Sequence, residues 1–422
     1  MPNPGIGASG QMGIAAEVIS PPTSFAGAAA AGGALTAGTY KYLITAINAN
    51  GETNVASPEV TVTTSAGNLT AHLTWIASTG ATGYRIYRTA AGGATNTELF
   101  LVAVGLVLVY DDIAVGAPAG AFPTVNTATA PGTYVAPSKW FPIRNEKLQY
   151  QQATVWRRPI RKSADIIGAV AGNAHTEGDI ELEALEDVVI HFLYATRNSI
   201  VKSNVGANYT YVATPTPAAI PIRTLSITVE RNGIVFGYTG CVVGNFKFGL
   251  DEGLMIFTVG IVGQDETVQS LPVPTFSTTV PFGAGQYNIQ IPTATQVFDV
   301  DTFEWTCENN ADPQFRLKDT GRGAQFVKFG ERQLGLTCER DFLDRTDYDA
   351  FKALTSQSLT ITASKGANNK ITLLMPVAIK DTYEVGLSGE GDLVRASIAY
   401  QAPIDGSGNS YTITVLTQEV VV

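Results

Sequence analysis

The 422-residue sequence predicts a mainly β protein of the α+β class. Three domains are expected: two tandem domains of sandwich or barrel-like form, each with one short helix, and a separate β-sandwich inserted into the first. Hydrophobic residues make up 45% of the chain and charged residues 15%, which is typical of a folded protein. In addition, one pattern of strands and a helix occurs twice, and alternating apolar and polar residues run between positions 39 and 110.

The repeated pattern keeps its order of elements without obvious sequence identity. The first copy has strand-like segments and one helix-like segment at 147–150, 178–182, 185–194 (helix), 225–229 and 254–262. The second copy has them at 302–305, 333–336, 348–354 (helix), 359–362 and 393–399. The offset between the copies is steady except for one jump, which falls in the polar, Pro-rich stretch 197–221 of the first copy. Slippage confined to one loop-like stretch indicates a real internal repeat, and two copies suggest a symmetric assembly.

The inserted sandwich is predicted from five strand-like segments at 39–48, 59–64, 71–75, 83–89 and 99–110. Trp75, followed by the alternating Tyr84, Ile86 and Tyr87, resembles the core pattern of a fibronectin type III or immunoglobulin-like domain. The flanking stretches 21–39 and 113–133 are rich in Ala, Gly, Pro and Thr and are expected to be linkers. The expected boundaries are 1–20 with 129–272 for the first tandem domain, 21–128 for the insertion with its linkers, and 273–422 for the second tandem domain.

The two predicted helices carry apolar residues at helical spacing, at 187–195 and 346–354. Thr346 is the expected N-cap of the second, ahead of two aspartates in the first turn. The tandem domains are expected to be joined by an extended linker over 264–286, which contains Pro272, Pro274 and Pro281.

Several classes of function are disfavoured by the sequence. The net charge of −10 provides no basic stripe for nucleic-acid binding. Residues 5–10 spell G-x-G-x-x-G, but without the flanking strand, helix and acidic residue of a dinucleotide site, so a flexible arm is expected and no cofactor. The three histidines show no metal-ligand spacing, and Cys241, Cys307 and Cys338 are expected to be buried, reduced thiols. No catalytic or metal site is predicted, and no segment is apolar enough over its length to span a membrane.

Carboxylates cluster on one predicted strand. Asp179, Glu181 and Glu183 alternate with apolar residues, so the three acids share one face. Glu339 and Asp341 occupy the corresponding place in the second copy. A solvated strand face, an acidic lining and a glycosidase pair are the alternatives, although glycosidase carboxylates normally come from different strands across a cleft.

The order of several motifs resembles that of the tail tube protein of long, flexible-tailed bacteriophages. The motifs are Ile6-Gly7-Ala8-Ser9-Gly10-Gln11-Met12-Gly13, Lys139-Trp140-Phe141-Pro142-Ile143, His175-Thr176-Glu177-Gly178-Asp179-Ile180-Glu181-Leu182-Glu183, Tyr238-Thr239-Gly240-Cys241-Val242-Val243-Gly244-Asn245-Phe246, Phe303-Glu304-Trp305 and Glu339-Arg340-Asp341-Phe342-Leu343-Asp344-Arg345-Thr346. Met375-Pro376-Val377 in the second copy departs from Gly240-Cys241-Val242-Val243 in the first. The resemblance covers ~300 residues and leaves the inserted sandwich outside it.

The resemblance implies a structural virion protein that polymerises as stacked trimeric, pseudo-hexameric rings around a channel for DNA ejection. It implies no enzyme activity and no membrane. The expected partners are other copies of the chain, the tape-measure and tail-end proteins, and double-stranded DNA that passes without specific binding. Assembly in the host cytoplasm into a virion tail is expected. The candidate bore-lining acids are Asp179, Glu181, Glu183 and Glu339, and a loop with Arg197, Asn208, Tyr209 and Tyr211 is the candidate contact between rings. The alternatives are a host-binding adhesin or fibre of stacked β-domains and, with no catalytic constellation behind it, a virion-borne glycosidase.

Overall fold

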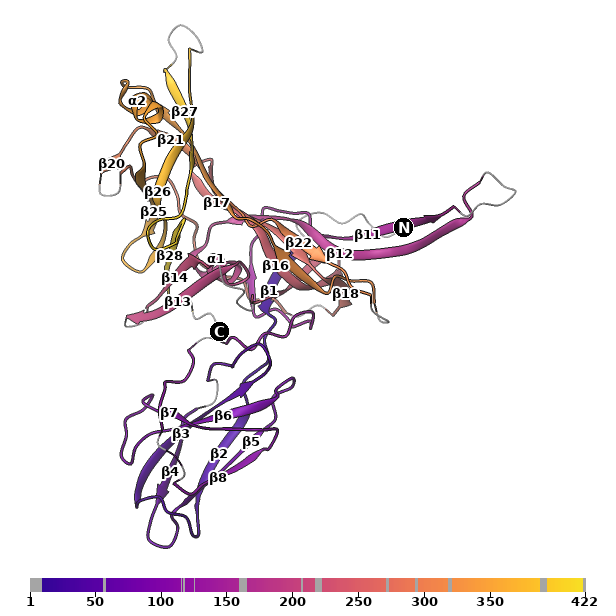
Figure 1. Ribbon diagram of the computed structural model, residues 1–422, viewed down its shortest axis with the longest axis vertical. Coiled ribbons are helices and arrows are strands. Elements are labelled where there is room, and N and C mark those ends of the chain that lie inside the picture. Colours follow the sequence, from indigo (N-terminus) through magenta and orange to yellow (C-terminus); the bar gives the residue numbers. More distant parts are fainter. Residues whose placement is uncertain are drawn as a thin grey trace. The chain divides into compact units, whose positions relative to one another are not determined.

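The computed structural model describes residues 10–55, 58–114, 116, 118–124, 126–158, 165–205, 208–216, 222–270, 273–292, 295–317, 321–387 and 393–419. The chain divides into two compact units (Figure 1). Unit 1 comprises Met1–Ala16 and Gly132–Val420, and unit 2 comprises Glu17–Pro131. Strands dominate both units, so the mainly β prediction is confirmed. The predicted arm at residues 5–9 lies outside the described residues.

Unit 2 contains two antiparallel sheets. The first has the order β2 (Thr23–Ala30), β5 (Thr70–Ile76) and β8 (Val109–Asp112). The second has the order β4 (Val60–Thr64), β3 (Gly38–Ile47), β6 (Gly83–Arg88) and β7 (Leu99–Val104). Their apolar faces share one core, in which the Trp75 ring lies 5.4 Å from Tyr84 and 6.4 Å from Phe25. Two sheets around one core form a sandwich.

The linker predicted at 21–39 is wrong, because β2 occupies part of it. This strand is rich in Ala and Gly, which have low strand propensity, so the sequence carries no strand signal there. Backbone pairing to β5 and contact of Phe25 with Trp75 hold it in the sheet.

Unit 1 has two halves, formed by its residues before and after position 272. A long antiparallel sheet runs through both halves and is called the long sheet below (Figure 1). Its strands, in order of pairing, are β11 (Gln149–Arg157) with β10 (Asn145–Glu146) beside it, β12 (Gly168–Glu183), β17 (Leu254–Gly263), β16 (Ile234–Asp251), β21 (Val300–Glu308), β24 (Gln333–Asp341), β27 (Arg395–Gln401) and β26 (Asn369–Gly386). The ladder between β16 and β21 joins the two halves.

The long sheet has one apolar and one polar face because its strands alternate. In β12, Ile180 and Leu182 are fully buried, whereas the acids between them are not. The same alternation continues in β16 and β21, whose aromatic residues pack together: Phe248 stacks on Phe257 at 4.6 Å and contacts Trp305 at 6.0 Å. The core of unit 1 therefore lies against the apolar face and leaves the polar face to solvent.

Each half closes its core with a second sheet. In the first half the order is β9 (Lys139–Phe141), β1 (Gln11–Ala16), β15 (Leu225–Arg231), the first part of β16 and β18 (Asp265–Gln269). In the second half it is β20 (Gln296–Val297), β19 (Tyr287–Gln290), β25 (Gln357–Lys365), the first part of β26, β28 (Thr412–Thr417), β14 (Asn208–Pro215) and β13 (Asn198–Val205). A short hairpin, β22 (Ala311–Gln314) and β23 (Phe326–Phe329), follows β21.

The two helices occur where the spacing predicts them, as α1 (Glu186–Tyr194) and α2 (Thr346–Lys352). Seven residues of α1 are buried, whereas α2 has none. The expected cap at Thr346 is wrong: Arg345 is the N-cap residue, and the Thr346 amide donates to the Asp344 carboxylate at 2.7 Å, so Asp344 satisfies one of the free N–H groups at this helix end.

Two segments that were expected as a loop and as a linker contain strands instead. The stretch 197–221, expected as a loop, forms the hairpin β13–β14, which adds to the edge of β28; residues 206, 207 and 217–221 lie outside the described residues. The linker expected at 264–286 begins with β18, which pairs with β16; Pro272 lies outside the described residues. In both places backbone pairing with a remote strand overrides a polar sequence.

Candidate functional site

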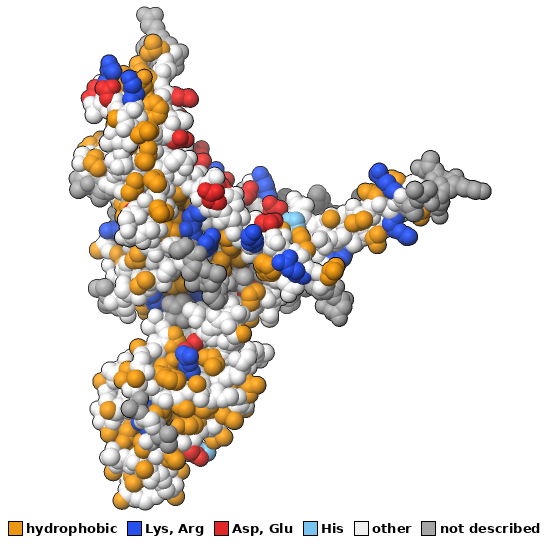
Figure 2. Space-filling model, viewed as in Figure 1, with side chains coloured by type: hydrophobic (Ala, Val, Ile, Leu, Met, Phe, Trp, Pro, Cys, Tyr) orange, Lys and Arg blue, Asp and Glu red, His pale blue; other side chains and the backbone are white. Residues whose placement is uncertain are grey.

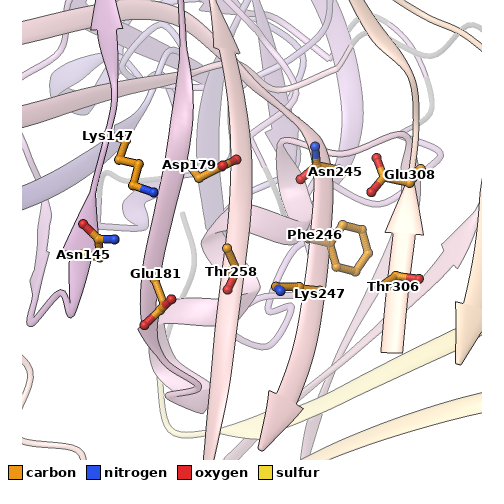
Figure 3. Close-up of a pocket in the computed structure, with 10 residues that line it drawn as sticks. All are labelled: Asn145, Lys147, Asp179, Glu181, Asn245, Phe246, Lys247, Thr258, Thr306 and Glu308. Atoms are coloured by element: carbon orange, nitrogen blue, oxygen red, sulfur yellow. The ribbon is translucent and has the colours of Figure 1, made fainter. Parts of the chain in front are cut away.

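The polar face of the long sheet gathers side chains from both halves of unit 1. Figure 3 shows Lys147 and Asn145 beside β12, Asp179 and Glu181 on it, Thr258 on β17, Asn245 and Lys247 on β16, and Thr306 and Glu308 on β21. These residues line a shallow polar depression. Its side chains share one face because each occupies an alternate position of its strand.

The three acids predicted on one strand lie on this face. Asp179 is exposed, and Glu181 and Glu183 are half-buried. Glu339 of β24 is exposed and pairs with Ser397 of β27. The structure thus places Asp179, Glu181 and Glu183 together, and puts Glu339 on the second half of the same sheet, two positions from exposed Thr337.

One row across the sheet brings acids of the two halves close together. Asp179 pairs with Gly260, and Asn245 pairs with both Gly260 and Glu308. Gly260 has no side chain, and the Asn245 amide covers it, because a Cβ on Gly260 would lie 2.4 Å from Asn245 Oδ1. Partial burial and the negative charge of Asp179 raise the pKa of Glu308. The electrostatic potential in the depression is therefore negative enough to disfavour the ionised form of a carboxyl group of the protein itself.

Cations neutralise only part of this charge. Lys247 Nζ lies 3.1 Å from Glu304 Oε2. Arg144 Nη2 lies 2.5 Å from Asp251 Oδ2, and Asp251, together with Glu181 and Glu183, raises the pKa of Arg144. Asp179 and Glu308 have no resolved ion pair among the described residues. An excess of negative charge on a face gives a long-range field that repels a polyanion.

Among the described residues no group of three or more His, Cys, Asp or Glu side chains could hold a metal ion. The expected burial of Cys241, Cys307 and Cys338 is confirmed, and burial raises the pKa of Cys307 and of Cys338 to about 12. Thiols with such pKa values are not nucleophiles at neutral pH.

The four residues predicted as a loop between rings lie in or beside the hairpin β13–β14. Tyr211 is fully buried, and its hydroxyl donates to the Glu419 carbonyl at 3.0 Å, so it cannot face another ring. Asn208 bonds to Asn368 at 2.9 Å, and Tyr209 lies against the Lys202 ammonium. Arg197 Nη1 donates to the Gly330 carbonyl at 3.4 Å. All four contact their own chain.

Sequence reasoning missed the acids and the lysine of the strands β16 and β21. Lys247 lies between Phe246 and Phe248, and the run Phe303-Glu304-Trp305-Thr306-Cys307-Glu308 alternates just as β12 does. That alternation is a visible signal for one polar face per strand. It does not reveal that these faces coincide, because the ladder between β16 and β21 joins remote segments.

No helix among the described residues is long and apolar enough to cross a membrane. No curated protein matches the chain. A family model described as "Phage tail tube protein" matches residues 120–402, which is more than half of the chain and includes the long sheet. The resemblance seen in the sequence motifs is thereby confirmed at the level of the family. The chain belongs to the phage tail tube protein family, a structural family of the virion tail whose members self-assemble into a tube.

Proposed function

We propose that three copies of this chain close into a ring with pseudo-sixfold symmetry, and that stacked rings form the conduit through which phage DNA enters the host. The tape-measure and tail-end proteins would bind such a tube inside and at its ends. In this proposal the two halves of unit 1 are copies of one tube domain, 1–20 with 129–272 and 273–422. Unit 2 is an immunoglobulin-like insertion between segments of the first copy.

Matching ladders support the relation between the halves. In the first half β12 pairs with β17, which pairs with β16, and in the second half β24 pairs with β27, which pairs with β26. A bulge interrupts the register after Val243 in β16 and after Lys380 in β26. Bulges are specific features of a fold, so their coincidence indicates a common template.

The single observation that carries the proposal is the junction between β16 and β21. This ladder pairs Phe246 with Cys307 and Phe248 with Trp305. Counting from the two bulges, Phe246 and Phe248 correspond to Tyr383 and Val385 of β26. Among the described residues, the edge of β26 that would correspond to the junction is unpaired over 382–386.

The other half of such a junction is also open. The strands β12 and β24 can be aligned through their pairs with β17 and β27. In this alignment the partner of Cys307 on β24 corresponds to the partner of Tyr150 on β12, so Cys307 corresponds to Tyr150 and Trp305 to Leu148. Within the described residues β11 pairs only with β12. Joining β26 of one chain to β11 of the next would set Tyr383 against Tyr150 and Val385 against Leu148. Unpaired strand edges are aggregation sites unless something covers them, and in a closed ring these edges of β26 and β11 cover each other.

The helices point to the same arrangement. Helix α1 contacts β26 and β28, and its Glu186 carboxylate lies 3.0 Å from Lys365 Nζ of β25, so the second half covers it. Helix α2 has no buried residue, and Leu354 beside it is 67% exposed. If the junction repeats between chains, the next chain's first half covers α2 as this chain's second half covers α1.

The geometry of the long sheet suits a wide bore. Each half supplies four strands. Six halves make about 24 strands, more than the roughly 22 of the largest transporter barrels with a filled lumen. With strands ~4.8 Å apart and tilted by ~40°, the backbone diameter is roughly 50 Å. The acids Asp179, Glu181, Glu183 and Glu339 would face this bore and repel phosphates spaced one per ~1.7 Å of duplex.

Electron microscopy of the purified chain tests the proposal. Hollow filaments with three copies of unit 2 per ring are expected. Six copies per ring would reject the trimer, and soluble oligomers of fixed size would favour the adhesin alternative. A Tyr383→Pro variant should fold but fail to polymerise, because proline removes an edge donor. A Leu387→Pro variant, next to the same strand and 87% exposed at that position, is the matched control and should polymerise.

A further inference from the structure

The strands β11 and β12 extend beyond the other strands of the long sheet as a two-stranded arm, which we define as 153–158 and 168–172 (Figure 1). The arm exposes large apolar side chains: Val155 is 54% exposed, Trp156 55% and Val170 52%. Hydrophobic and basic side chains lie along it in Figure 2. A two-stranded hairpin is marginally stable in water, so an apolar one is expected to lie against something.

The second half of unit 1 contains a hairpin of the same register. In β22–β23, Ala311 pairs with Phe329 and Pro313 with Val327. In the arm, Thr154 pairs with Ala171 and Trp156 with Ala169. Thr154 follows Tyr150 at the same spacing at which Ala311 follows Cys307, the residue that corresponds to Tyr150. The face with Asp312 and Lys328 is the more exposed one in the hairpin β22–β23, and Pro313 and Val327 are half-buried.

This second hairpin is not free, because it lies on the first half of its own chain. A Cβ on Gly244 would lie 3.0 Å from the Ala311 Cβ. The Ala174 amide donates to the Arg322 carbonyl at 3.0 Å, and Gln264 Nε2 donates to the Gln325 carbonyl at 3.2 Å. The chain therefore contains a complete example of how such a hairpin docks on the neighbouring half.

We infer that the arm docks in the same way on the second half of the neighbouring chain in the ring. The inference rests on the proposed ring and names the contact that fastens it. The bulge residue Gly244 corresponds to Asp381, and Ala174 and Gln264 correspond to Arg332 and Pro403. The receiving surface is thus formed by the ends of β24 and β27 and by the bulge of β26.

The receiving surface is open and complements the arm. Asp381 is exposed, and Ile404, which lines one shallow pocket with Arg332 and Pro403, is 70% exposed. By the template, Thr154 and Trp156 face this surface, whereas Val155 and Val170 correspond to Asp312 and Lys328 and face away from it. Trp156, which is exposed in the single chain, supplies the apolar side chain. Docking would cover apolar area on both chains.

A pair of cysteines tests the contact at its best-defined point. Because Ala311 approaches Gly244, Thr154 of one chain should approach Asp381 of the next within the ~3.8 Å between Cβ atoms that a disulfide needs. The chain with both Thr154→Cys and Asp381→Cys is assembled under reducing conditions and then oxidised. Its own three cysteines are buried and give little background. On a non-reducing denaturing gel the monomer band should be lost, and the products should stop at three chains.

The possible outcomes separate the contact from the ring. Tubes that form normally but give no cross-link overturn the docking inference and leave the proposed function standing. Cross-linked ladders beyond three chains mean that the arm reaches a stacked ring, which also overturns it. Absence of tubes with the unmodified chain rejects the proposed function and this inference with it.

Two controls keep the test sound. Mixing chains that carry only Thr154→Cys with chains that carry only Asp381→Cys must still give cross-linked dimers, which a bond within one chain cannot produce. A double variant with Thr154→Cys and Ser407→Cys, both at exposed positions, should not cross-link. If the double variant with Asp381→Cys fails to assemble, the Trp156→Ser variant is tested instead, and its tube formation should fall at least tenfold. The control is Phe298→Ser, at an aromatic residue that is 86% exposed, and this variant should form tubes as the unmodified chain does. Equal tube formation by both serine variants contradicts the inference.

Discussion

Phe248 of β16 and Trp305 of β21 stand opposite each other in the ladder that joins the two halves of unit 1, with their ring centroids 6.0 Å apart. Both side chains are fully buried. The junction is therefore part of the hydrophobic core and not a surface contact between separate domains. The same pair of positions, occupied by Val385 and Leu148, is where one chain is proposed to meet the next.

Trp305→Ala should destabilise the unassembled chain by about 3–5 kcal/mol, because it leaves a cavity beside Phe248 and Tyr411. Urea denaturation measures the change. Val385→Ala is the matched variant: Val385 is 42% exposed, so stability should change by less than about 0.5 kcal/mol while polymerisation weakens. A large loss of stability in Val385→Ala would mean that this edge is already covered within the single chain.

The three cysteines should resist alkylation in the native chain. Burial and the raised pKa values of Cys307 and Cys338 keep them as thiols that reagents cannot reach. Mass spectrometry after iodoacetamide treatment at pH 8 should find them largely unmodified, and modified at all three positions in denaturant. Rapid labelling of the native chain, or an intermolecular disulfide, would contradict this.

Replacement of Asp179, Glu181 and Glu183 by Lys should slow DNA passage and leave assembly intact. The acids lie on the polar face and support no core contact, whereas lysines there would bind phosphates. The measurement is the rate of DNA ejection from virions that carry the variant, at low and high salt. Asp179→Lys alone can be compared with Asp111→Lys in unit 2, where the carboxylate is also exposed. An equal effect of both single variants would remove the bore assignment.

The stability of unit 2 should fall as pH rises toward neutrality, through Glu98. Burial and the neighbouring Glu59 raise the pKa of Glu98 to about 7, from a usual value of 4.5. The folded state thus binds this proton more tightly than the unfolded state, and the resulting stabilisation is present below pH 4.5 and lost as pH rises through 7. Glu98→Gln should therefore stabilise unit 2 at pH 8 and have little effect at pH 4.5. Pulse proteolysis of the intact chain in urea measures the stability of unit 2 at each pH.

Glu59 provides the opposite control for this prediction. A hydrogen bond with Glu98 and the nearby Lys41 ammonium, whose Nζ lies 2.9 Å from the Glu59 carboxylate, lower the pKa of Glu59. A lowered pKa gives stability that is present above the usual value and lost on acidification. Glu59→Gln should therefore destabilise unit 2 at pH 8. If both glutamines act in the same direction, the two carboxyl groups do not divide their roles in this way.

Unit 2 should be dispensable for polymerisation. Deleting residues 18–130 and joining the ends with a short Gly-Ser bridge removes only unit 2 and leaves β1 paired with β15 and β9. Electron microscopy should show tubes of unchanged bore. An insoluble product would instead mean that unit 2 is integral to the fold of unit 1.

Sequence alternation alone shows which positions face inward along the strands that it predicts. The alternation of Ile180 and Leu182 with the acids of β12 is a period of two, which fixes the phase of a strand locally. The sequence also located α1 and α2, whose apolar spacing needs only one element to be visible. The order of elements in the two halves followed from the same local patterns.

Tertiary structure alone decided the register and the partners. Matching the segments 178–182 and 333–336 set Leu182 against Leu336. The ladders, counted from the bulges, set Leu182 against Arg340 and Glu181 against Glu339, which agrees with the match of the acids alone. Alternation with a period of two looks the same after any shift by an even number of residues, so the apolar pattern alone cannot correct such an error of register. The hairpin β13–β14 and the strand β2 were likewise expected as loop and linker, because their polar or small residues become strands only when β28 and β5 supply backbone partners. The ladder between β16 and β21, which places Asp179 and Glu308 on one face, depends on pairing between segments that are remote in the chain, and no local pattern records it.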